Sequence, residues 1–350
     1  MTSNSVLAIR VDGNSRVGFG HIMRCCAIAH AAEAMGCEVV FFVSDEESAK
    51  MVQTQGYAPE VLGGDYRLLR EDDALLLANA VEKADIKGVI VDSYAATDEF
   101  LATLRKRRHC NEIKIGYIDD EYRFENGFSP EPVRLPVDVL VNYGLGASSE
   151  LYWRTYEGSD VELLIGPAFA PVREEFSSTC YMVGDLVSTI LVTTGSTNPN
   201  GVLERLVLCC AEAMPEASIH IVVGANARFE DEESFESRFI FHHNPRDMRS
   251  LMLASDLVIS AGGTTLYELA ALGVPTIAVP ITENQLANVS GWRKRCLGFA
   301  LQSVEWNDGE LIGMIHSLAT DTVLRQALSS GMRGMCDGQG ARRVVEAILG

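Results

Sequence analysis

The feature that most constrains the fold of this chain is an alternation, repeated along its length, between short apolar runs and longer helical patterns. The first half contains five apolar runs, at residues 6–11, 38–43, 88–92, 113–118 and 137–142. Most of them are apolar at nearly every position, which is typical of strands buried on both faces. The pattern therefore predicts a parallel sheet with helices packed on both of its faces.

The same pattern starts again after a polar stretch at residues 173–185. Further strands are expected at residues 189–193, 218–224, 257–260 and 276–279, and closing helices from about residue 310 to residue 349. A chain of 350 residues is also too long for one ordinary core. The sequence predicts two Rossmann-like α/β domains facing each other across a cleft, residues 1–175 and 187–350, with the final helices able to pack back on the first domain.

Composition and charge argue against several classes of function. The net charge of −19 disfavours a general surface for nucleic acid or anionic membranes, because such partners require clustered Lys and Arg. The nine cysteines include no CxxC pair, and no apolar run reaches the roughly 18 residues that span a bilayer. The N-terminus has no cationic segment followed by an apolar one, so no signal peptide is expected. We expect a soluble cytoplasmic protein, a monomer or weak homo-oligomer, without nucleic-acid partners or a membrane span.

The histidines of the second half do not form a convincing set of metal ligands. His220 falls inside an expected strand, whereas His242 and His243 precede Asn244 and Pro245 in an expected loop. Protein zinc sites use three or four ligands at characteristic spacings. We therefore predict no metal and no cofactor.

The strongest local signal is the sequence SAGGTTLYEL at residues 260–269. A buried strand ends there, two glycines turn the chain, and two threonines open a helix. Bare amides at a helix start, together with two hydroxyls, form a cradle suited to a diphosphate. Glu268 lies about one turn further on, placed to accept hydrogen bonds from a ribose diol. The residues expected at the phosphates are Gly262, Gly263, Thr264 and Thr265. The alternative is a strand–turn–helix junction with an ordinary threonine cap.

Two further loops belong to the same edge of the second sheet. Asn284 and Gln285 follow the strand at residues 276–279, and their side-chain amides suit sugar hydroxyls or acetamido groups. The alternative for this pair is an amide-rich helix cap. Gly195 and Ser196 follow the first strand of the second domain and are a weaker candidate for anion binding. Open α/β sheets bind ligands at the carboxyl ends of their strands, where all three loops belong.

In the first domain, the loop after the first strand leads to a histidine at a helix start. Gly18 and Gly20 precede it and let the backbone approach a ligand closely. The helix dipole at this end favours the neutral imidazole of His21, which makes this residue a competent general base. The alternative is a histidine that caps the helix or packs in the core.

Other polar residues end the strands of the first domain. Asp92 ends one strand, and Asp119 and Asp120 follow the next. These carboxylates either line the cleft or cap loops. Tyr94 either contacts a sugar or belongs to a purely structural Asp-Ser-Tyr turn.

Together these segments resemble, over nearly the full length of the chain, the nucleotide-sugar hydrolases of pseudaminic acid biosynthesis and the related spore-coat polysaccharide proteins. The more discriminating piece is Gly18-x-Gly20-His21-x-Met23-Arg24, preceded by Arg10-x-Asp12. The other matching pieces are Val91-Asp92-Ser93-Tyr94, Ile118-Asp119-Asp120, Leu164-Ile165-Gly166-Pro167, Arg173-x-Glu175-Phe176, Thr194-Gly195-Ser196, Gly262-Gly263-Thr264-Thr265 with Glu268, and Asn284-Gln285. The second half also resembles the donor-binding domain of MurG-like GT-B glycosyltransferases.

The chain departs from this family at two places. Members often carry Trp-Glu after the glycine–threonine turn, where this chain has Tyr267-Glu268. Residues 120–136 also lack the basic, histidine-containing stretch of many members.

The resemblance implies a GT-B-like fold and a metal-independent reaction that removes UDP from a 2,4-diacetamido-2,4,6-trideoxyhexose. Water would attack the anomeric carbon with inversion, with the histidine matching His21 as general base. The diphosphate would lie at residues 262–265 and the ribose at Glu268, with Ser196 closing from the neighbouring loop and the uracil near residues 241–244. The alternatives are a GT-B glycosyltransferase with the same UDP-sugar donor, and a sensor that binds UDP-sugars without turnover.

Overall fold

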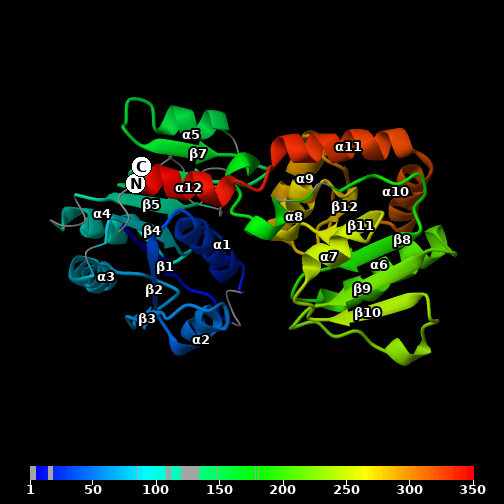
Figure 1. Cartoon of the computed structure of the whole chain (residues 1–350), viewed down its shortest axis with the longest axis horizontal. Coiled ribbons are helices and arrows are strands. Elements are labelled where there is room, and N and C mark those ends of the chain that lie inside the picture. The colour runs from blue at the N-terminus through cyan, green and yellow to red at the C-terminus, as the bar shows by residue number, and fades with distance from the viewer. Residues whose placement is uncertain are drawn as a thin grey trace. The chain divides into compact units, whose positions relative to one another are not determined.

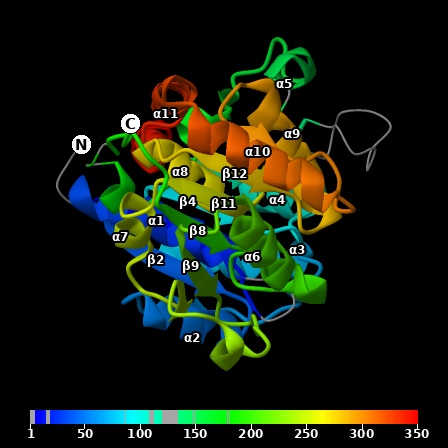
Figure 2. The same cartoon turned by 90° about the vertical axis from the view of Figure 1, so that its right-hand side faces the viewer.

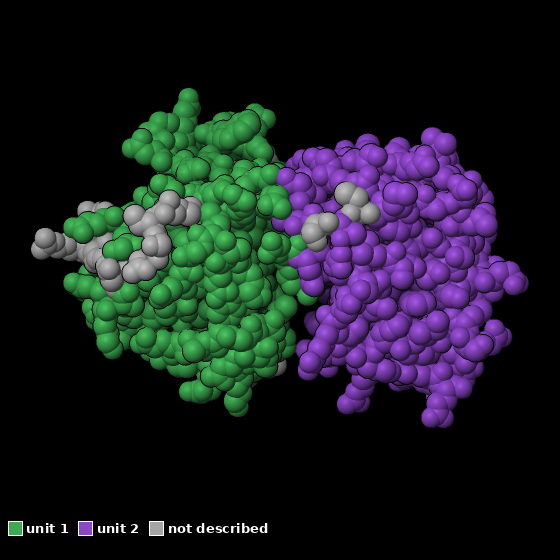
Figure 3. All heavy atoms as spheres, viewed as in Figure 1, with its two compact units in different colours: residues 1–174, 339–350 green, residues 175–338 purple. Residues whose placement is uncertain are grey.

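The computed structural model of the chain describes residues 5–14, 19–84, 86–107, 112–119, 134–147, 149–177, 179 and 181–350. The chain divides into two compact units, which Figure 3 colours separately. Unit 1 comprises residues 1–174 and 339–350, and unit 2 comprises residues 175–338.

Unit 1 is built on a parallel sheet whose described strands follow the order β3-β2-β1-β4-β5-β6-β7 (Figure 1). These strands are β1 (Val6–Val11), β2 (Glu38–Val43), β3 (Glu60–Val61), β4 (Gly88–Asp92), β5 (Lys114–Ile118), β6 (Val139–Asn142) and β7 (Glu162–Ile165). The five strands that the sequence predicts in this half are all present. The other two, β3 and β7, are the edge strands, too short or too exposed to carry a long apolar run.

Helices cover both faces of this sheet. They are α1 (Gly20–Ala34), α2 (Glu46–Thr54), α3 (Glu71–Lys83), α4 (Asp98–Lys106), α5 (Ser149–Thr155) and α12 (Gly340–Leu349). Helices α3 and α4 share one buried cluster with Val89 of β4. The neighbouring Gly88 points to the opposite face, where a Cβ atom would lie 2.4 Å from Ile348 of α12. Gly88 therefore gives the last helix room to pack on this sheet.

Unit 2 contains a second parallel sheet, with the described strands in the order β10-β9-β8-β11-β12-β13. These strands are β8 (Thr189–Thr193), β9 (Ser218–Val223), β10 (Phe239–His243), β11 (Leu257–Ala261), β12 (Thr276–Val279) and β13 (Phe299–Ala300). Counted from the first strand of each unit, both sheets begin with the Rossmann order 3-2-1-4-5-6. The two Rossmann-like parallel sheets confirm the fold class that the sequence predicts.

Helices also pack against the second sheet, where α6 contacts β8 and β9 (Figure 2). The helices of unit 2 are α6 (Val202–Ala213), α7 (Met248–Leu253), α8 (Thr265–Leu272), α9 (Leu286–Lys294), α10 (Asp308–Thr320) and α11 (Thr322–Met335). In the described ranges, none of the helices combines the length and the apolar composition needed to cross a membrane.

Strand β10 shows that one prediction is wrong, because His242 and His243 were expected in a loop. Both residues lie in the strand, which pairs in parallel with β9. Phe241 of the same strand packs edge-to-face against Phe229. Aromatic residues favour strands when they have neighbours to pack against. That packing comes from a segment ten residues earlier, which a search for apolar runs does not detect.

Candidate active site

The strand order of each unit creates one switch point, where successive loops leave in opposite directions. In unit 1 this point lies between β1 and β4, and in unit 2 it lies between β8 and β11. Ligands of open α/β sheets bind outside the carboxyl ends of strands at such points. His21, Tyr94, Gly195, Ser196 and the predicted phosphate loop follow these strands, whereas Asn284 and Gln285 follow the neighbouring strand β12.

In unit 1, His21 is the second residue of α1 and is held by Asp92 at the end of β4. The imidazole Nδ1 lies 2.7 Å from Asp92 Oδ1. The pairing of Val11 with Asp92 in neighbouring strands brings this carboxylate beside the start of α1. A carboxylate can only accept a hydrogen bond, so the Asp92 contact favours the tautomer with the proton on Nδ1, although the donor-only guanidinium of Arg24 also lies 2.8 Å from that nitrogen. The lone pair of Nε2 is then available to accept a proton.

Arg24 lies one turn after His21 on the same helix face and binds the same carboxylate. Its Nε donates to Asp92 Oδ2 at 2.6 Å, and its Nη2 donates to Oδ1. Its Nη1 donates to the hydroxyl of Tyr143 at 2.7 Å. Cys25 Sγ donates to Asp92 Oδ2 at 3.2 Å. Asp92 is thus surrounded by donors from α1.

These contacts decide the charge of the groups around the imidazole. Burial alone would raise the pKa of Asp92, but the charge of Arg24 and the hydrogen bonds from Arg24 and His21 outweigh it and lower that pKa. Asp92 is therefore a carboxylate at neutral pH. Burial, followed by the Asp92 charge, raises the pKa of the Cys25 thiol well above its usual value. Cys25 therefore remains a neutral thiol and is a poor nucleophile.

His21 forms part of the wall of a cavity of about 290 Å³. The cavity is lined by Asp12, His21, Tyr66, Arg67, Ser93, Tyr94 and Ala95. His21 itself is only 4% exposed. Tyr94 is 43% exposed, and its ring meets the imidazole edge-on with 4.3 Å between centroids. The imidazole is thus enclosed in unit 1 and borders this cavity.

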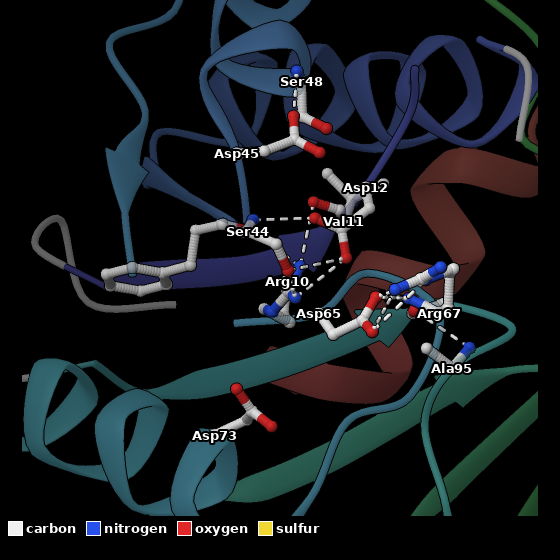
Figure 4. A network of polar contacts seen from close by, with 12 residues as sticks. Arg10, Val11, Asp12, Ser44, Asp45, Ser48, Asp65, Arg67, Asp73 and Ala95 are labelled. Atoms are coloured by element: carbon white, nitrogen blue, oxygen red, sulfur yellow. Dashed lines mark hydrogen bonds and ion pairs between the residues drawn. The ribbon is translucent and has the colours of Figure 1, made fainter. Parts of the chain in front are cut away.

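Another part of the cavity wall is Asp12, just beyond the end of β1 (Figure 4). Its carboxylate forms an ion pair with Arg10 at 2.8 Å and accepts from the Ser44 amide at 2.7 Å. Arg67 lies on the loop before α3, and its guanidinium pairs with Asp65 at 2.8 Å. The wall therefore combines a fixed carboxylate with a solvent-exposed guanidinium.

Asp119, another predicted carboxylate of unit 1, is not among the residues that line this cavity. Asp119 is fully buried and accepts a hydrogen bond from the Tyr152 hydroxyl at 2.7 Å. That hydroxyl also accepts from Asn142 Nδ2 at 2.8 Å. Asp119 therefore stabilises the interior next to β6. Asp120 and Gly18 lie outside the described residues.

In unit 2, the predicted phosphate loop runs from the end of β11 into α8. Thr264 is the N-cap residue, but its side chain makes no capping hydrogen bond. Within the described chain, the amides of Gly263 and Thr264 donate no hydrogen bond. Glu268 lies half-buried in the first turn of α8. The alternative of an ordinary threonine cap does not apply, and donors remain at this helix start.

The loop after β12 braces the phosphate loop. Gln285 Oε1 accepts from the amides of Gly262 and Ile281, both at 3.1 Å. Asn288 Nδ2 donates to the Gly262 carbonyl at 2.8 Å and its Oδ1 accepts from the Tyr267 hydroxyl at 2.7 Å. Gln285 therefore holds the loop through its oxygen. Tyr267, the residue at the family's frequent Trp position, has a bracing role through its hydroxyl.

The remaining predicted residues lie at the rim of the same strand ends. Asn284 is exposed, and its Oδ1 accepts from the Thr282 hydroxyl at 2.6 Å. Gly195 follows β8 with φ +79°, a left-handed conformation that favours glycine. Ser196 is exposed, and its carbonyl accepts from the Asn226 amide at 2.9 Å. Because β8, β11 and β12 are neighbours, the three predicted loops share one sheet edge.

The sequence did not predict the side chains that surround His21. The motif at residues 18–24 contains Arg24 but assigns it no role, and the position of Asp92 at a strand end is compatible with either the cleft or a loop cap. The spacing of three residues between His21 and Arg24, on one helix face, was the signal that could have linked them. Arg67 carried no signal. Among the residues that the structure describes, no group of three or more His, Cys, Asp or Glu side chains could hold a metal ion.

Comparison with known proteins connects both units to one family. Residues 189–320, all within unit 2, match the model of the glycosyltransferase family 28 C-terminal domain. The spore coat polysaccharide biosynthesis protein SpsG of Bacillus subtilis is 26% identical over 98% of this chain and 97% of its own length. The chain is therefore similar to the SpsG-like GT-B proteins over nearly its full length.

Two further relatives show how this SpsG-like chain relates to known activities. A Helicobacter pylori protein named pseudaminic acid cytidylyltransferase and UDP-2,4-diacetamido-2,4,6-trideoxy-beta-L-altropyranose hydrolase is 21% identical over 77% of the chain. The chain spans only 43% of that protein. The crystal structure of MurG from Acinetobacter baumannii is 14% identical, with a TM-score of 0.67 over 98% of this chain and 99% of MurG. MurG shares the fold of the SpsG-like chain.

Proposed function

We propose that this protein hydrolyses a UDP-sugar, releasing UDP from a 2,4-diacetamido-2,4,6-trideoxyhexose, with His21 as the general base. A GT-B enzyme that acts on nucleotide sugars in polysaccharide biosynthesis is the broader class to which this activity belongs. The observation that carries the proposal is the His21–Asp92 pair at the wall of the unit 1 cavity. The hydrolase name of the Helicobacter pylori relative supports it.

The proposed step is a direct displacement at the anomeric carbon. A water oxygen forms a bond to C1 while the bond between C1 and the UDP oxygen breaks, and its electron pair leaves with UDP. The water proton passes to Nε2 of His21, since Asp92 holds the proton on Nδ1. Such general-base help contributes roughly 10²–10⁴ in rate.

In this proposal, unit 2 binds the leaving group. The amides of Gly263 and Thr264 and the hydroxyls of Thr264 and Thr265 would receive the diphosphate at the start of α8, where the helix dipole favours negative charge. Holding the charge that develops on UDP replaces a general acid. Glu268 would accept hydrogen bonds from the ribose. The free thiols of the described cysteines fit a reducing compartment such as the cytoplasm.

A glycosyltransferase is the second candidate, favoured by the family match of unit 2. In that case His21 would deprotonate an acceptor hydroxyl instead of water. The two candidates differ in the group that attacks C1, so the acceptor requirement of UDP release distinguishes them.

Incubation of the protein with the UDP-linked diacetamido sugar, without any acceptor, tests the proposal. We expect equal amounts of UDP and free sugar, with inverted configuration of the first anomer seen by NMR. Release of UDP only after addition of a second carbohydrate would identify a transferase. Binding without turnover, unaffected by His21→Ala, would identify a sensor.

A further inference from the structure

Arg24 has no part in the proposed displacement, yet it is buried beside the proposed base. Its side chain is 5% exposed, and it shares the Asp92 carboxylate with His21. Its Nη2 also lies 2.8 Å from His21 Nδ1. A buried guanidinium this close acts on any change of charge at the imidazole.

An aspartate beside a histidine has two effects that oppose each other in a general base. It orients the ring and selects the tautomer, which helps catalysis. It also attracts a second proton, because a nearby negative charge favours the imidazolium. An imidazolium has no lone pair left to accept a proton from water. A positive charge on the other side of the carboxylate cancels the second effect and leaves the first.

We propose that Arg24 is a positioning residue that neutralises Asp92, so that Asp92 orients His21 without driving the imidazole to its protonated form. The inference rests on the proposed role of His21 as general base. With a neutral imidazole, the charges of His21, Asp92 and Arg24 sum to zero. The bidentate contact of Arg24 with both oxygens of Asp92 also fixes the plane of the carboxylate.

None of the other described groups near the imidazole neutralises the charge of Asp92. Within the described ranges, the titratable and charged side chains that face His21 or line its cavity are Arg24 and Cys25 from α1, Asp92 and Tyr94 from the end of β4, Asp12 after β1, Tyr143 after β6, and Tyr66 and Arg67 from the loop before α3. Asp12 is paired with Arg10, and Arg67 is paired with Asp65 and largely exposed. The thiol of Cys25 stays neutral, because burial and Asp92 raise its pKa.

The pH dependence of kcat/KM in charge variants of this trio tests the inference. Arg24→Met leaves the Asp92 charge uncompensated, so the acidic limb of the profile should move up by about one pH unit or more, a tenfold change in proton concentration. Arg24→Lys keeps the charge but loses the bidentate contact. Its limb should stay within a few tenths of a unit of the wild type, while kcat falls.

Asp92→Asn provides a second test that does not require Arg24 to be removed. It leaves the Arg24 charge uncompensated, so the acidic limb should move to lower pH, opposite to the shift in Arg24→Met. A structural role alone predicts rates lowered by one constant factor at every pH in both variants. That result, or shifts in the same direction, would overturn the inference.

An NMR titration of the His21 ring separates this inference from the proposed function. The His21 signals are identified by their loss in His21→Asn, and their midpoint needs no substrate. A midpoint that rises in Arg24→Met and falls in Asp92→Asn supports the role of Arg24 even if no UDP-sugar is hydrolysed. Unmoved midpoints in an active hydrolase would refute the role of Arg24 and leave the proposed function intact.

Discussion

The two units share a strand order, but their candidate sites consist of different chemical groups. In unit 1 the site consists of buried side chains, with His21 and Arg24 both bonded to Asp92. In unit 2 it consists mainly of backbone, with the amides of Gly263 and Thr264 at a helix start. The same switch point of the same topology therefore holds a buried side-chain network in one unit and backbone amides at a helix start in the other.

This difference suggests which unit determines the reaction. Backbone amides at a helix start bind phosphate whatever the side chains around them, so such a site suits many nucleotide-sugar enzymes. Accordingly, the glycosyltransferase family match covers residues 189–320 of unit 2 and none of unit 1. In a side-chain network, by contrast, the ability to accept or donate a proton depends on the identity of each residue, so one substitution can change the reaction. We infer that unit 2 recognises the donor and that unit 1 selects what attacks it.

The largest expected effect separates the roles of the two units. His21→Asn should lower kcat by roughly 10²–10⁴, the contribution of a general base. The affinity for UDP, measured by calorimetry, should change by no more than a few-fold, because the proposed nucleotide contacts belong to unit 2. His30→Asn, an exposed histidine of the same helix, is the matched control and should retain activity. Wild-type turnover in His21→Asn would show that the base is misassigned.

The next largest effect concerns the proposed ribose contact. Glu268→Ala should weaken UDP binding by about 1–3 kcal/mol, the cost of leaving buried polar groups unpaired. The affinity for inorganic diphosphate should change much less, because that ligand carries no ribose. Equal losses for both ligands would indicate a general distortion of the α8 start, and unchanged UDP affinity would remove the ribose assignment.

A pair of neighbouring glycines distinguishes packing from ligand approach in unit 2. A Cβ atom at Gly262 would lie 2.4 Å from Val289, so Gly262→Ala should destabilise the protein by about 1–3 kcal/mol. No atom lies within 4 Å of a Cβ atom at Gly263, so Gly263→Ala should leave the melting temperature nearly unchanged. If the diphosphate approaches this backbone, Gly263→Ala should nevertheless weaken UDP binding. Unchanged binding would argue against phosphate at this residue.

The smallest effect is a difference in acid sensitivity between the units. Burial is the main cause that lowers the pKa values of His220 and His242, which lie 3.1 Å apart from Nε2 of His242 to Nδ1 of His220. A histidine whose pKa is lower in the folded state contributes to stability above about pH 6.5, and this stabilisation is lost as the pH falls. The stabilisation that comes from the lowered pKa of Asp92 is present above about pH 4 and is lost only below that pH.

Hydrogen exchange followed from pH 7 to pH 5 should therefore show protection falling in β9 and β10 before it falls in β1 and β4. His242→Gln should reduce this loss by removing one of the two charges that form at low pH. Equal acid sensitivity of the two sheets, or no effect of His242→Gln, would contradict this expectation.

The sequence predicts the fold and parts of the sites to different degrees, for physical reasons. Strands such as β4 and β11 were predictable because burial on both faces leaves a continuous apolar run. β10 is not predicted because its aromatic residues depend on contacts with Phe229 and Phe235, which lie outside the strand. The glycine–threonine turn was found from local chemistry.

The network around His21 was less predictable because it depends on sheet order. Asp92 reaches the imidazole because β1 and β4 are neighbours, although 71 residues separate the two side chains. The bracing role of Gln285 likewise depends on β11 and β12 lying side by side. Polar residues at strand ends indicate where a site lies. The hydrogen-bond partner of each side chain, however, depends on which strands are neighbours in the sheet.

The most direct test of the central claim is the position of a heavy oxygen after turnover in water enriched in ¹⁸O. If His21 directs water to the anomeric carbon, mass spectrometry of the first turnovers should find the label at C1 of the released sugar and none in UDP. His21→Asn should lower the rate of this incorporation by the same factor as kcat. Label in UDP would place the attack on phosphorus, and sugar released without label would exclude water as the nucleophile; either result would contradict the account.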